Sequence, residues 1–152
     1  MRDNSQRGVT LLEMLIVVAI IATVAAVSFP SLTNGLASVR LTSAASGVAS
    51  FFTSSMNTVE RREQAAAIVV TPKENRVDVF TAASGLKPSR TFQPQAGITF
   101  EGEDPHRYLL FPGGAIPRIA VVLRNEKGSR RSISIDPVTG VPQVTRIEDT
   151  PQ

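Results

Sequence analysis

Glu13 is the acidic residue with the most unusual surroundings in the sequence. No residue from Met14 to Val39 is charged, and the run from Met14 to Phe29 consists almost wholly of apolar side chains. A carboxylate at the edge of a stretch that avoids water is costly, and such ionisable groups usually have a partner or a function. We therefore expect Glu13 to have a charged partner. The elements around Glu13 must then position its carboxylate for that contact.

A cluster of basic residues lies between positions 107 and 131. Its six cations are Arg107, Arg118, Arg124, Lys127, Arg130 and Arg131. Glu126 is the one acid in this stretch, so the local charge is about +5, enough to attract phosphates or an acidic partner. Contact of the last five cations with anions or DNA is one interpretation. The alternative is an exposed sheet edge that charged residues protect against aggregation.

The sequence offers few residues that could serve in catalysis or metal binding. The sequence has no cysteine and one histidine, His106, which follows Pro105 in a predicted loop with no recognisable nucleophile and acid beside it. Disulfides, thiolate metal clusters and most triad chemistries are therefore excluded. Glu101-Gly-Glu-Asp104 offers oxygen ligands for calcium but lacks the spacing of a recognised calcium loop, which favours a solvated loop. We expect neither an enzyme nor a metal or cofactor site.

The apolar stretch is long enough to cross a membrane. From Val9 to Phe29 it has 21 positions, or about 31 Å as a helix, which matches the hydrocarbon thickness of a bilayer. Two arginines precede it, and positive flanks stay on the cytoplasmic side. We predict a single span with the rest of the chain outside the cytoplasm. The alternative is a secretory signal cleaved near Ala26-Val27-Ser28, against which Glu13 argues.

The segment around Glu13 reads Arg7-Gly8-Val9-Thr10-Leu11-Leu12-Glu13-Met14-Leu15-Ile16-Val17-Val18-Ala19-Ile20-Ile21. It resembles the N-terminus of type IV pilins and type II secretion pseudopilins. The resemblance implies that a prepilin peptidase cuts after Gly8 on the cytoplasmic face. It also implies methylation of the new N-terminus, Val9, at a position where the family usually has phenylalanine.

The same resemblance gives roles to Glu13 and Pro30. Glu13 becomes the fifth residue of the processed chain, the family's near-invariant glutamate, which pairs with the N-terminal amine of a neighbouring subunit. Such an amine would offset the cost of a carboxylate in lipid. Pro30 becomes the twenty-second residue, where many members have a proline that kinks the helix, and any helical proline loses a hydrogen bond. The alternative is that Pro30 ends the span.

An amphipathic helix follows the span. Apolar residues recur at steps of three and four, the spacing of one helix face, at Leu41, Ala45, Val48, Phe52, Met56 and Val59. We expect the helix to continue past the span to about Arg62, roughly 80 Å in all, with a flexible joint near Gly35 and local weakening at Gly47. Phe51, Phe52 and Met56 are predicted to pack against a sheet.

The remainder of the chain predicts short strands separated by turns. Two β-prone runs, 66–71 and 76–81, predict a hairpin with Pro72-Lys-Glu-Asn75 as its turn. Residues 82–96 have no sustained period and are expected to form a loop. Further strands are predicted at 97–101, 107–111, 118–124, 130–136 and 143–147. We predict an α+β fold, a long N-terminal helix packed on a C-terminal antiparallel sheet.

Four C-terminal segments carry a second, looser resemblance. They are Ile98-Thr-Phe100, Tyr108-Leu-Leu-Phe-Pro-Gly-Gly114, Arg118-Ile-Ala-Val-Val-Leu123 and Arg131-Ser-Ile-Ser-Ile-Asp-Pro-Val-Thr-Gly140. They resemble H-type minor pseudopilins and related minor pilins. G-type pseudopilins usually have a tryptophan-containing calcium loop and many major pilins have a C-terminal disulfide, and a chain without tryptophan or cysteine has neither.

Together the two resemblances imply a structural subunit. The expected parts are a leader (1–8), a transmembrane and assembly helix (9–30) and a periplasmic pilin-like domain (31–152). The expected role is a minor subunit of a type II secretion pseudopilus; the alternative is a minor pilin of a type IV pilus, active in pilus assembly, adhesion or DNA uptake. The implied partners are the prepilin peptidase, other pilin or pseudopilin subunits, the assembly platform of the bacterial inner membrane and the lipid bilayer. An anchored periplasmic domain that never assembles is a further alternative.

Overall fold

The computed structural model describes residues 10–147, apart from the side chains of residues 29–34. The chain divides into two compact units, Met1–Leu36 and Ala37–Gln152, which we call the N-terminal and C-terminal units. One helix, α1 (Leu11–Arg62), contributes to both. It ends at the residue predicted from the sequence and continues past Pro30, so Pro30 does not end the helix. Whether Pro30 ends the membrane span stays a prediction.

In the C-terminal unit, α1 buries the predicted apolar face. Leu41, Ala45, Val48 and Phe52 are fully buried, Val59 is nearly so, and Met56 packs against the core. Phe51 is also buried. The same core contains fully buried side chains from the strands, namely Ile68, Val77, Leu123 and Ile133. The three- and four-residue spacing therefore identified the residues by which the helix holds the domain together.

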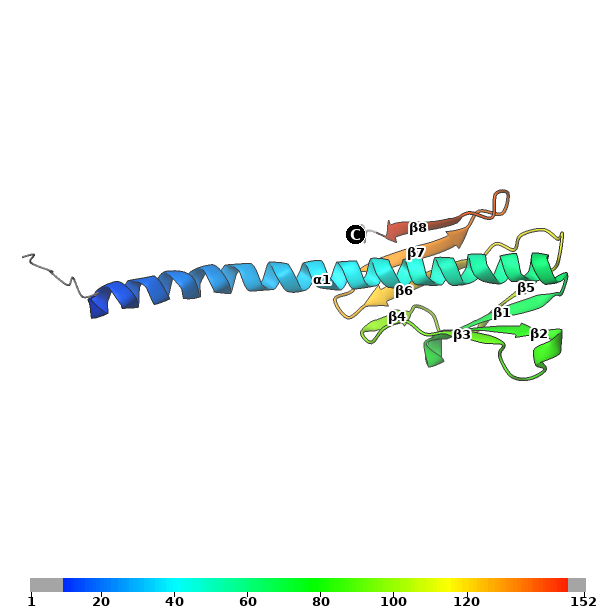
Figure 1. Ribbon diagram of the computed structural model, residues 1–152, viewed down its shortest axis with the longest axis horizontal. Coiled ribbons are helices and arrows are strands. Elements are labelled where there is room, and N and C mark those ends of the chain that lie inside the picture. The colour runs from blue at the N-terminus through cyan, green and yellow to red at the C-terminus, as the bar shows by residue number, and fades with distance from the viewer. Residues whose placement is uncertain (1–9, 148–152) are drawn as a thin grey trace, which may run out of the picture. The chain divides into compact units, whose positions relative to one another are not determined.

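Within residues 10–147, eight strands form two antiparallel sheets, whereas the sequence pattern predicts one. The first sheet has the order β3-β2-β1-β5, from β1 (Ala66–Thr71), β2 (Arg76–Thr81), β3 (Arg90–Phe92) and β5 (His106–Leu110). The second has the order β4-β6-β7-β8, from β4 (Ile98–Phe100), β6 (Ala120–Asn125), β7 (Arg130–Ile135) and β8 (Pro142–Ile147). Both sheets share one core with the C-terminal part of α1 (Figure 1).

The sheets separate because β5 and β6, although consecutive, do not pair. Their connection contains Pro112 and Pro117, and a proline has no N–H to donate to a ladder. Instead, β5 returns to pair with β1, and β6 pairs with β4 and β7. Each of these strands lies within two residues of its predicted position. His106, predicted in a loop, is the first residue of β5, where it pairs with Val70.

The expectation of a loop over residues 82–96 is wrong. This segment contains a short 3-10 helix, η2 (Ala82–Ser84), and the strand β3, whose Phe92 pairs with Val77 of β2. Phe92 also packs against the core, 5.7 Å from Phe51 between ring centroids. A side chain at Gly47 would lie 3.1 Å from the Phe92 ring, so the glycine makes room for it. These contacts are distant in sequence, which is why local periodicity did not reveal the strand.

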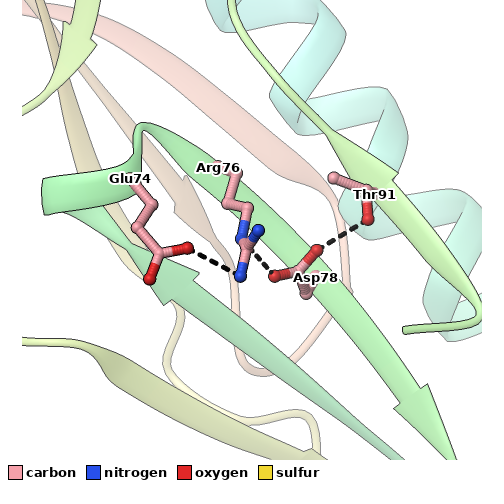
Figure 2. A network of polar contacts seen from close by, with 4 residues as sticks. All are labelled: Glu74, Arg76, Asp78 and Thr91. Atoms are coloured by element: carbon pink, nitrogen blue, oxygen red, sulfur yellow. Dashed lines mark hydrogen bonds and ion pairs between the residues drawn. The ribbon is translucent and has the colours of Figure 1, made fainter. Parts of the chain in front are cut away.

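A polar network on the first sheet ties β3 to β2 (Figure 2). Arg76 forms ion pairs with Glu74, at 2.6 Å, and with Asp78, at 2.8 Å. Thr91 on β3 donates a 2.6 Å hydrogen bond to Asp78 Oδ1. Asp78 is almost completely buried, so a partner on each oxygen offsets the cost of removing its charge from water. All three residues of β3 pair with β2, and the Thr91–Asp78 hydrogen bond adds a side-chain contact across that pairing.

Asn75 joins the two sheets. It follows η1 (Pro72–Glu74), the 3-10 turn between β1 and β2, and adopts the left-handed conformation, with φ 52° and ψ 45°. Its Nδ2 donates to the Ile98 carbonyl at 2.9 Å, and its Oδ1 accepts from the Phe100 N–H at 3.0 Å. One side-chain amide thus hydrogen-bonds β4 as a neighbouring strand would, at the edge opposite β6.

The β7–β8 turn provides a pH-dependent contribution to stability. Asp136 accepts hydrogen bonds from the backbone N–H groups of Thr139 and Val138, both at 2.8 Å, and these bonds lower the pKa of its carboxyl. The stabilisation is therefore fully present above the unfolded pKa, near the ordinary 3.8, and is lost as the pH falls through the lower folded value. We expect Asp136→Ala to destabilise the domain at pH 7 and to flatten its acid unfolding curve below about pH 4.

Denaturant unfolding at several pH values measures this difference. Asp104→Ala is a control, because Asp104 is exposed and lies outside the β7–β8 turn. Equal losses of stability at pH 7 and pH 2 in Asp136→Ala would contradict the expected linkage.

Candidate functional site

Thr10 caps the N-terminus of α1 and sets the position of Glu13. The Glu13 N–H donates to Thr10 Oγ1 at 3.2 Å, and the Met14 N–H donates to the Thr10 carbonyl at 3.2 Å. Helices begin in this way because the first N–H groups have no partner within the helix. Glu13 therefore lies in the first helical turn, where the positive end of the helix dipole favours a carboxylate.

The helical turns after Glu13 expose an apolar surface. The segment Leu11–Ser28 has a mean hydropathy of 2.5 and none of it is buried within the chain, so it is long and apolar enough to cross a membrane. Its large exposed side chains include Leu11, Leu15, Val18, Ile21 and Val24. This surface requires lipid or another protein to cover it.

The cap was not identified from the sequence, although its pattern was visible there. Thr10-Leu-Leu-Glu13 is the spacing of a capping box ahead of an apolar run. Gly8 and Val9, the expected cleavage and methylation residues, lie outside the described residues, as does the side chain of Pro30. The bend at Pro30 and the joint at Gly35 stay predictions.

The basic cluster does not form one surface. Arg107 lies on β5 in the first sheet, and Arg118 precedes β6 in the second. Arg124 and Arg130 are paired residues at the β6–β7 hairpin, next to Lys127 in its turn and Arg131 on β7. Arg130 forms an ion pair with Glu101 at 3.3 Å, which reduces the positive charge there. Four of the six cations thus meet at one hairpin, and two lie elsewhere.

The acidic segment at 101–104 has a structural contact. Glu101 directly follows β4 and forms an ion pair with Arg130 on β7. Within residues 10–147, the side chains that the structure describes include no group of three histidine or carboxylate residues placed to hold a metal ion. The ion pair between Glu101 and Arg130 connects the end of β4 to β7, two strands of the second sheet.

Comparison with known proteins assigns the N-terminal segment. A family model described as the prokaryotic N-terminal methylation motif matches residues 3–29, which include Gly8, Val9 and Glu13. No curated protein and no solved structure matches the chain significantly. The match agrees with the capped helix start and with the exposed apolar segment that follows it. The N-terminal segment thus carries the prepilin-type methylation motif of type IV pilins and pseudopilins.

Proposed function

We propose that the chain is a minor pseudopilin of a type II secretion system, cut after Gly8 and assembled into a pseudopilus that exports proteins. The methylation motif over residues 3–29 carries the proposal, supported by the apolar surface of Leu11–Ser28. On this view residues 1–8 are the leader, residues 9–30 span the inner membrane, and residues 31–152 lie in the periplasm. The role as a minor subunit rests on the C-terminal resemblance to H-type pseudopilins.

The proposed assembly into a filament uses the same apolar surface. In the membrane, lipid covers the apolar side chains between Leu11 and Ser28. In a filament, the helices of other subunits cover them, so the chain can leave the bilayer without exposing this surface to water. Glu13 then pairs with the amine of a neighbouring subunit, and Val9 carries the methyl group on its own amine. The inner-membrane assembly platform supports this transfer.

The N-terminal peptide tests the proposal directly. After co-expression with a prepilin peptidase, mass spectrometry is expected to find a chain that begins at Val9 and carries one methyl group. Gly8→Ala is expected to abolish processing, because it changes the residue after which the proposed cleavage occurs, and the chain should stay in the membrane fraction. Gly35→Ala is a matched control, since a Cβ there would have no atom within 4 Å.

The other possible N-termini contradict the proposal in different ways. An intact Met1 in the wild-type chain would indicate a membrane anchor that is never processed. A chain that begins near Phe29 would indicate an ordinary secretory signal. Removal of residues 1–8 with no recovery in a filament fraction would confirm processing but contradict assembly.

A further inference from the structure

A pocket of about 210 Å³ lies between the last turns of α1 and the first sheet. Its apolar floor is formed by Val59, Ala66 and Val79. Arginines lie at its mouth, Arg62 from α1 and Arg90 from β3. The volume is below the roughly 300–1,000 Å³ of small-molecule pockets, so it suits one side chain with its neighbouring backbone.

The arginines are available to an anion. The Arg90 guanidinium lies 4.9 Å from the centre of the Phe51 ring, a stacking that limits its mobility. Within the described part of the chain, no carboxylate forms an ion pair with Arg62 or Arg90, and none lines the pocket. Glu60, on the same end of α1, accepts instead from the Gly113 N–H, at 3.1 and 3.2 Å from its two oxygens.

The hydroxyl groups of the pocket favour a ligand that donates hydrogen bonds. Ser55, Thr58 and Ser89 donate their own protons to the backbone carbonyls of Phe51, Ser54 and Val79, at 2.7–2.8 Å. Their oxygens therefore present lone pairs. A matching ligand has a carboxylate for the arginines, a short aliphatic stem for the floor and N–H groups for the hydroxyl oxygens.

We propose that this pocket binds an acidic side chain of a partner polypeptide, with the carboxylate between Arg62 and Arg90 and the peptide N–H groups near the hydroxyls. An inorganic anion would leave the apolar floor uncovered, and a free fatty acid would have no N–H to donate. The proposal does not depend on processing or filament assembly, so it can fail while the proposed function stands.

The test uses the full ¹⁵N-labelled chain in zwitterionic detergent micelles and two blocked peptides, acetyl-Ala-Glu-Ala-amide and acetyl-Ala-Gln-Ala-amide. We expect the glutamate peptide to shift the amide resonances of Ser89 and Arg90. Arg62→Ala and Arg90→Ala should each weaken this binding about two- to fivefold, the range that exposed ion pairs contribute. Arg90→Lys should retain part of it. Arg146→Ala, which removes an exposed arginine outside the pocket, should leave it unchanged.

Three results would overturn the proposal. The first is equal binding of the glutamine peptide, because the arginines would then recognise no charge. The second is equal binding of butyrate, because a free acid lacks the N–H groups. The third is an unchanged affinity in the double variant Arg62→Ala/Arg90→Ala. Preserved resonances of β6 and β7 in each variant would show that the domain is still folded.

Discussion

Asn75→Ala is expected to lower the free energy of unfolding of the C-terminal domain by at least about 3 kcal/mol. Two costs add in this estimate. Alanine in the left-handed conformation costs about 1–2 kcal/mol. Loss of the amide leaves the Ile98 carbonyl and the Phe100 N–H without their partner, at about 1–3 kcal/mol per group if water does not replace it. Both residues are buried, so water replaces the amide poorly.

Two further variants separate these costs. Asn75→Gly removes both hydrogen bonds but tolerates a φ of 52°, so it should be less destabilising than alanine. Asn75→Asp keeps an acceptor for the Phe100 N–H but has no donor for the Ile98 carbonyl. We expect alanine to be the least stable of the three.

Urea unfolding of the full chain in micelles can be followed by tyrosine fluorescence. Tyr108 is the one tyrosine, the chain has no tryptophan, and Tyr108 packs against the core. Equal stability of the glycine and alanine variants would show that backbone strain at position 75 has no effect. Wild-type stability in all three would show that β4 does not depend on the amide.

The helix was predictable because its signal is repeated along the chain. Leu41, Val48 and Phe52 mark one face over several turns, and each turn supports the same assignment. The β1–β2 hairpin was predictable for a related reason, since its turn residues are adjacent to the strands they join. Local chemistry therefore determined the C-terminal end of α1 and both strands of this hairpin.

The sheet arrangement depends on contacts that no local pattern contains. Whether Phe92 forms a strand is decided by Val77 and by the space at Gly47, both distant in sequence. The joining of the sheets by Asn75 depends on β4, more than twenty residues later. The candidate N-terminal site, by contrast, could be recognised from local sequence, because Gly8, Val9 and Glu13 lie close together in one contiguous motif. The Arg62–Arg90 pocket was missed, since its two arginines meet only in the folded domain.

Glu13→Gln is expected to leave processing at Gly8 intact while removing the subunit from the filament. The substitution keeps the size of the side chain but removes the negative charge that a neighbour's amine would neutralise. The first turn of the helix should persist, because the Thr10 cap uses the backbone N–H of Glu13 and not its carboxylate. A pairing worth at least 1.4 kcal/mol would change incorporation by about tenfold or more.

Matched variants connect the loss to the charge. Glu13→Ala should reproduce the defect, with the chain held in the membrane fraction. Thr23→Ala should incorporate normally, because Thr23 Oγ1 donates to the Ala19 carbonyl of its own helix and needs no partner from another subunit. Filament and membrane fractions are compared by quantitative immunoblotting, with the N-terminal mass measured in both.

The combination of readouts decides what Glu13 does. A glutamine variant that is processed but absent from the filament places the role of the carboxylate after cleavage, where an uncompensated charge near lipid makes pairing with an amine favourable. A glutamine variant that is not cleaved would instead make Glu13 part of what the peptidase recognises. Normal incorporation of both Glu13 variants would mean that the apolar surface of Leu11–Ser28 is sufficient for assembly, and that the carboxylate does not set the register between subunits.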